Sequence, residues 1–98
     1  DPEAAKEILQ SLVCEMEKNR DSWKKGIETQ HLPTLSALAH KMLPHFRLLK
    51  NSHTVSLLSY MEKQTDGFTP EIREYAQTIL REIDRLIQLA CKKMDTQG

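Results

Sequence analysis

The chain has 98 residues, the size of one ordinary domain and too short to form two separate hydrophobic cores. Its 14 basic and 14 acidic side chains cancel, so no net charge attracts the whole chain to nucleic acid or to anionic lipid. The composition, 39% hydrophobic and 29% charged with only three glycines, is typical of a compact, helix-rich domain and argues against disorder and extended β structure.

The N-terminal third of the chain predicts one long helix over residues 2–30. Asp1-Pro2-Glu3 is a helix-start signal, because aspartate caps free amides, proline fits a first turn, and an acidic group favours the positive end of the helix dipole. The apolar residues that follow recur at helical spacing and predict one buried face: Ile8, Leu9, Leu12, Val13, Met16, Trp23 and Ile27.

Three further helices are predicted from boundary signals. The Leu32-Pro33 pair begins a helix over residues 33–50, and Asn51 with Ser52 ends it and caps a short helix over residues 53–64. A turn at residues 65–67 precedes a helix over residues 70–94, whose apolar face comprises Ile72, Ala76, Ile79, Ile83, Leu86, Ala90 and Met94. Four amphipathic helices with short connections predict an all-α antiparallel four-helix bundle with up-down-up-down topology.

A helical wheel of the second helix separates a core face from an exposed histidine. The predicted core face comprises Leu35, Leu38, Met42, Phe46 and Leu49. His40 lies almost opposite, and a neutral imidazole offers an unprotonated nitrogen that can accept a phosphoryl group near pH 7. Its neighbours on the helix could form a docking surface, with Leu43 predicted to be exposed: Ser36, Ala37, Lys41, Leu43, Pro44 and Arg47.

The remaining polar residues have simpler interpretations. Glu62 lies near the apolar face of the third helix, where it could accept a hydrogen bond from His40 across the bundle, cap a helix, or pair with a lysine. The other histidines and both cysteines are interpreted as boundary or packing residues, and their spacings predict no metal site: His31, His45, His53, Cys14 and Cys91.

The segment Leu38-Ala39-His40-Lys41-Met42, in a helix that begins at a proline, resembles the histidine-containing phosphotransfer (HPt) domain of bacterial phosphorelays. The resemblance covers nearly the whole chain, because that family is a four-helix bundle of this length with its phospho-accepting histidine exposed midway along the second helix. It implies that His40 accepts a phosphoryl group from a receiver-domain aspartate and passes it to another receiver.

The same resemblance implies the surroundings of this reaction. The domain would need no cofactor of its own, since Mg²⁺ belongs to the receiver partner, and it would be a phosphoryl carrier within a histidine kinase system rather than a self-sufficient enzyme. We expect a monomeric, cytoplasmic domain that contacts response-regulator receivers and neither nucleic acid nor membrane. The segment would be excised from a hybrid sensor histidine kinase, as the soluble tail of a membrane-anchored protein.

The chain departs from the family pattern directly after the histidine. The family usually has lysine three residues after the histidine and glycine at the fourth, whereas this chain has Leu43 and Pro44. Proline lacks an amide hydrogen and is expected to kink the helix. Nearby cations at Lys41, Arg47 or Lys50 could partly replace the missing lysine.

Two other functions remain open from the sequence. One is the dimerising histidine helix pair of sensor kinases, although that family has an acidic residue directly after its histidine, where this chain has Lys41. The other is a helical bundle that only binds partners, in which the histidine has no chemical role.

Overall fold

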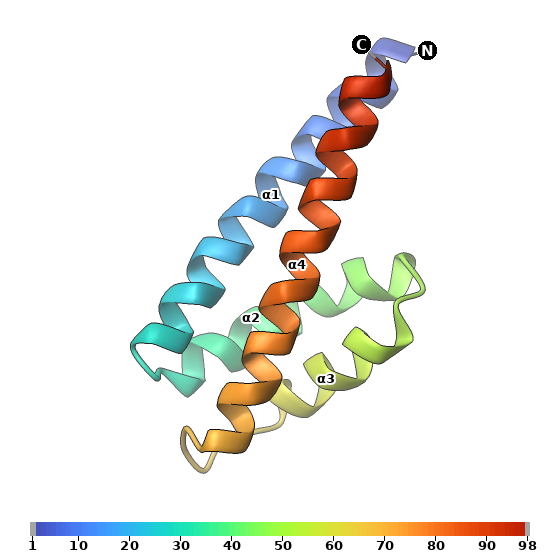
Figure 1. Ribbon diagram of the computed structural model, residues 1–98. Helices are drawn as coiled ribbons and strands as arrows, with labels where there is room; N and C mark the ends of the chain where they lie inside the picture. Colours follow the sequence, from blue (N-terminus) through green and yellow to red (C-terminus); the bar gives the residue numbers. More distant parts are fainter. Residues whose placement is uncertain (1, 98) are drawn as a thin grey trace.

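The computed structural model describes residues 2–97, with side chains described for residues 2–93. Its helices, in chain order, are α1 (Pro2–Glu28), α2 (Leu32–Leu48), α3 (Ser52–Glu62) and α4 (Pro70–Gln97) (Figure 1). Each helix packs against the next one, and α1 also packs against α4. The predicted all-α four-helix bundle is therefore confirmed, with boundaries close to those read from the sequence.

Polar side chains begin α2 and α3 at the predicted boundaries. His31 caps α2, because its Nδ1 accepts a hydrogen bond from the amide of Thr34 at 3.3 Å. Asn51 caps α3 in the same way, with its side-chain oxygen 3.3 Å from the amide of Thr54. The residues before these caps, Gln30 and Lys50, have φ values of 52° and 56°, the left-handed geometry that commonly ends the preceding helix.

The two long helices extend past the two short ones. Figure 1 shows α1 and α4 side by side, with both chain ends at the tip of this extension and with α2 and α3 covering only the other half. Ile8 was predicted to be buried, but it is 70% exposed. The N-terminal end of α1 belongs to the extension, which α2 and α3 do not cover (Figure 1). Met94 lies outside the residues whose side chains are described.

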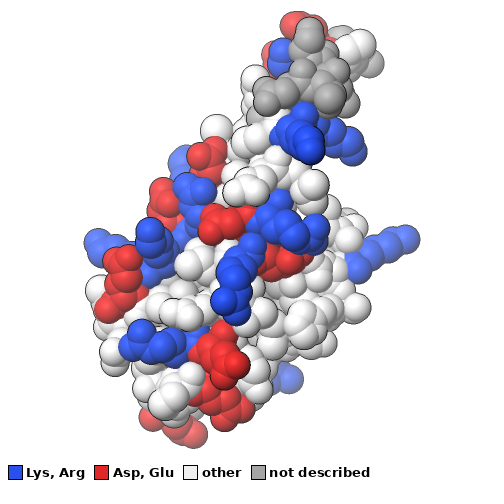
Figure 2. Space-filling model, viewed as in Figure 1, with Lys and Arg blue, Asp and Glu red and all other residues white. Residues whose placement is uncertain are grey.

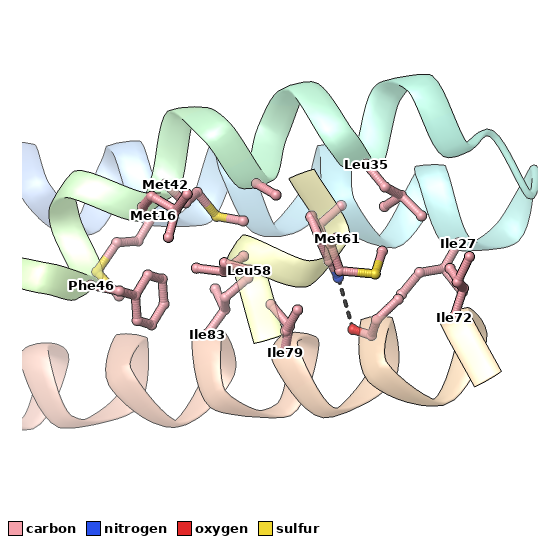
Figure 3. Close-up of a cluster of buried hydrophobic side chains, with 14 of the residues drawn as sticks. Met16, Ile27, Leu35, Met42, Phe46, Leu58, Met61, Ile72, Ile79 and Ile83 are labelled. Carbon is pink, nitrogen blue, oxygen red and sulfur yellow. Dashed lines mark hydrogen bonds between the residues drawn. The ribbon is translucent and has the colours of Figure 1, made fainter. Parts of the chain in front are cut away.

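All four helices contribute to one core, in which side chains from each converge (Figure 3). Trp23 of α1 is fully buried, and its Nε1 donates a 2.8 Å hydrogen bond to the backbone oxygen of Ala76 in α4. Gly26 lets α1 approach α2 closely, because a Cβ atom at this position would lie 2.8 Å from Cδ2 of the buried Leu35. These two contacts set the spacing of α1 against its neighbours.

A polar cluster connects α3 to α4. Asn51 donates a 2.7 Å hydrogen bond from Nδ2 to Glu82 Oε1, and Arg85 donates to both oxygens of the same carboxylate. The hydrogen bond from Arg85 lowers the pKa of Glu82, partial burial opposes the shift, and the bond from Asn51 adds to it. Elsewhere on the face drawn in Figure 2, positive and negative side chains are intermixed.

Candidate functional site

His40 lies midway along α2 on the side that faces away from the core. Its side chain is 78% exposed, whereas its neighbour Ala39 is completely buried. The backbone of this turn therefore packs against the core, while the imidazole is exposed to solvent. The exposure of His40 is what the wheel of α2 predicted.

Glu62 reaches the imidazole from the last turn of α3. Its Oε1 lies 2.6 Å from Nδ1 of His40, and about a third of its side chain is exposed. A second bond holds this turn of α3 against α2, because the hydroxyl of Ser36 donates to the backbone oxygen of Glu62 at 2.7 Å. Ser36 and His40 are one helical turn apart, so both bonds join the same stretch of α2 to the end of α3.

The contact with Glu62 determines which nitrogen of His40 is available. An ionised carboxylate can only accept hydrogen bonds, so Nδ1 must carry the proton that lies between the two groups. In a neutral imidazole the other nitrogen, Nε2, then holds the lone pair. In that tautomer, Nε2 is the nitrogen that an approaching partner would meet, on an exposed ring whose orientation is restrained by a carboxylate.

Pro44 lies one turn after His40 within a helix that continues to Leu48. In a regular helix the amide of residue 44 would donate to the carbonyl of residue 40, but proline has no amide hydrogen. The backbone carbonyl of His40 therefore receives no helical hydrogen bond from position 44. The proline ring itself is exposed beside the histidine.

The prediction that Leu43 is exposed was wrong. Leu43 is only 3% exposed, and the buried side of α2 is centred nearer to Ala39 than to Leu38. The reason is that α3 packs against the side of α2 that carries Ser36, and Leu43 lies between that side and the core. The same rotation leaves Leu49, predicted to be in the core, half exposed.

The other residues predicted for docking have different surroundings. Ala37, Pro44 and Arg47 are exposed on the same side as His40. Lys41 is directed toward α1, where its Nζ lies 3.2 Å from Glu15 Oε1. Sequence reasoning missed Leu48, which is 84% exposed near the end of α2. Its exposure depends on the rotation of α2 and on how much of α2 is covered by α3. A wheel of α2 alone determines neither.

We define the His40 face by its exposed α2 residues: Ala37, His40, Pro44, Arg47 and Leu48. It combines small and apolar side chains with one cation around the exposed imidazole.

The remaining candidate residues do not join this site. His31 caps α2, His45 is half-buried on the α1 side of the helix, and His53 is exposed in the first turn of α3. Cys14 and Cys91 are free thiols; Cys91 is half-buried, as expected of a packing residue, but Cys14 is exposed and that interpretation of it was wrong. Within the described residues, no group of three or more histidine, cysteine or acidic side chains is arranged to hold a metal ion.

Comparisons with known proteins do not assign a function, so the functional argument rests on the geometry of this site. No family model, curated protein or solved structure matches the chain. Over the described part of the chain, no helix is both long enough and apolar enough to cross a bilayer.

Proposed function

We propose that this domain is a histidine-containing phosphotransfer domain, in which His40 accepts a phosphoryl group from the aspartyl phosphate of a receiver domain and passes it to the aspartate of a second receiver. The observation that carries the proposal is the contact between His40 Nδ1 and Glu62 Oε1 on a ring that is otherwise exposed. An exposed histidine alone is common, whereas one with a carboxylate on its inner nitrogen has the arrangement that a nucleophile needs.

The chemistry follows from the available nitrogen. The Nε2 lone pair attacks phosphorus in line with the bond to the receiver carboxylate, so an N–P bond forms as the P–O bond breaks and the aspartate leaves as a carboxylate. The proton on Nδ1 stays in place, and the ring becomes cationic as Nε2 gives up its lone pair. Attack by a second receiver carboxylate reverses each of these changes and restores the neutral imidazole.

Glu62 is a positioning residue that also stabilises charge in this scheme. Its carboxylate faces a neutral ring before the reaction and a cationic ring as the N–P bond forms, so the interaction strengthens toward the transition state. The bond from Ser36 to the backbone of Glu62 keeps the carboxylate in reach of His40 without using the carboxylate itself. The receiver's Mg²⁺ supplies charge stabilisation on the phosphoryl oxygens.

The His40 face is the surface we assign to receiver docking. Ala37 and Pro44 flank the imidazole with little bulk, Leu48 offers exposed apolar area, and Arg47 is the cation available to an acidic receiver pocket. Lys41 contributes less, because it pairs with Glu15. We assign the domain to the cytoplasm, as a monomeric carrier that depends on its receivers for both phosphate donor and metal.

The test is phosphate transfer from a receiver domain charged with acetyl phosphate and Mg²⁺. The product should be labile to acid and stable to alkali, since that behaviour distinguishes a phosphoramidate from a phosphoester. Long-range ¹H–¹⁵N spectra of the product should show phosphorus bonded to Nε2 with Nδ1 protonated. Phosphate on Nδ1, or an acid-stable product, would exclude the proposed arrangement.

A further inference from the structure

An apolar cavity lies at the junction of α1, α2 and α4, apart from the His40–Glu62 pair. Its volume is about 230 Å³. The residues that line it are mainly aliphatic or sulfur-containing: Leu12, Met16, Asn19, Met42, His45, Phe46, Leu48, Leu49 and Ile83. Figure 3 shows four of them, Met16, Met42, Phe46 and Ile83, gathered at one end of the core.

Asn19 is the unusual member of this lining. It is only 5% exposed, and in the described part of the chain its side chain makes no hydrogen bond and no ion pair. Every fully enclosed side-chain nitrogen or oxygen of the described residues has a partner, so the unpaired amide of Asn19 is not fully enclosed, and Asn19 is one of the residues that line the cavity. An amide that keeps a small accessible area can form a hydrogen bond with a ligand in the cavity, and such a bond contributes modestly to affinity.

Size and lining together indicate the kind of ligand. An engineered cavity of about 150 Å³ lined by aliphatic and aromatic groups binds benzene, so a larger cavity of this kind can hold a bicyclic ring. Met16 and Met42 have flexible thioethers that adapt to a flat ring and contact it favourably, and Phe46 offers an aromatic edge or face. Leu48 and Leu49 line the cavity and are also exposed, so the cavity is open to solvent beside them.

We propose that this cavity binds a flat, bicyclic aromatic molecule that carries one N–H or O–H group, and that the Asn19 side-chain oxygen accepts the hydrogen bond from that group. The proposal does not depend on phosphoryl transfer, because neither His40 nor Glu62 lines the cavity. Failure of one proposal therefore leaves the other intact.

The experiment compares indole with indene, which has nearly the same shape but no N–H donor. Each compound is titrated into the wild-type domain and into Asn19→Leu, and the methionine methyl groups are followed by ¹H–¹³C spectroscopy. Met61 is buried elsewhere in the core and serves as an internal control. Gln10→Leu makes the same kind of change on the exposed side of α1 and serves as the control variant.

We expect indole to shift the methyl signals of Met16 and Met42 and to leave that of Met61 nearly unchanged. The ratio of indole affinity to indene affinity should fall about three- to tenfold in Asn19→Leu, the range expected for one hydrogen bond, and should not change in Gln10→Leu. If Asn19→Leu does not fold, Asn19→Met provides the same comparison with a more adaptable side chain.

Three results would overturn the proposal. The first is that indole leaves the Met16 and Met42 signals unshifted, and the second is that the affinity ratio is the same with and without Asn19. The third is a dimer, seen by sedimentation, that must dissociate before indole binds, because a second copy of the chain would then occupy the cavity.

Discussion

Glu62 Oε1 and His40 Nδ1 lie 2.6 Å apart, although the two residues are separated by 22 positions and belong to different helices. The contact exists because α3 ends where its last carboxylate meets the middle of α2, and because the Ser36 hydroxyl binds the backbone of that same residue. The packing of α3 against α2 therefore also fixes the orientation of the proposed nucleophile.

Glu62→Gln should slow phosphoryl acceptance about five- to tenfold and leave the melting temperature nearly unchanged. The amide can still accept a hydrogen bond from Nδ1, but it lacks the charge that stabilises a cationic ring, and charge-assisted bonds are about twice as strong as neutral ones. The rate constant for transfer from a phosphorylated receiver provides the measurement. A rate equal to that of the wild type would remove Glu62 from the mechanism.

Leu43 and Leu48 form a matched pair on α2, one buried and the other exposed. Leu43→Asp should destabilise the fold by about 3 kcal/mol or more, because it places a carboxylate in the core. Leu48→Asp should leave the stability within about 0.5 kcal/mol of the wild type and weaken receiver docking. Urea unfolding measures the effect on stability, and receiver titration measures the effect on docking. If Leu48→Asp bound the receiver as tightly as the wild type, Leu48 would not belong to the docking surface.

Trp23→Phe should lower the free energy of unfolding by about 1–3 kcal/mol. The change removes the buried hydrogen bond to the Ala76 carbonyl and leaves space where the indole ring was fully enclosed. Chemical denaturation, followed by circular dichroism because the only tryptophan is lost, gives the value. A loss below about 0.5 kcal/mol would mean that neither the bond nor the packing of the ring holds α1 against α4.

Acidification should weaken the bundle in part through Glu82. Because the folded state lowers the pKa of this carboxyl below its usual 4.5, the stabilisation is complete above that value and is lost as the pH falls through the folded-state pKa. Glu82→Gln should therefore flatten the decline of melting temperature below pH 4.5, whereas the exposed Glu28→Gln should not. Equal slopes for the two variants would contradict this assignment.

The helices of this chain could be predicted closely because their signals are local. Pro33, Asn51 and Pro70 mark helix starts whatever the rest of the chain does, and the spacing of apolar residues identifies amphipathic faces. The exposure of His40 followed from the same spacing. These features need no knowledge of how the helices are arranged.

The errors arise where tertiary packing decides. Leu43 is buried because α3 covers that side of α2, and Ile8 is exposed because α2 and α3 do not reach that part of α1. A wheel of one helix contains neither fact. From the sequence, the contact between Glu62 and His40 was one of several possible roles for Glu62. Whether it forms depends on which turn of α2 lies beside the last turn of α3, and the sequence does not give that.

The most direct test of the central claim is phosphate transfer from a charged receiver to the wild-type domain and to His40→Gln, measured together with the melting temperature of both proteins. We predict that His40→Gln accepts no phosphate and melts within a few degrees of the wild type, because an exposed side chain contributes little to stability. Single replacements of His31, His45 or His53 should leave acceptance intact. Acceptance by His40→Gln at the wild-type rate would contradict the account.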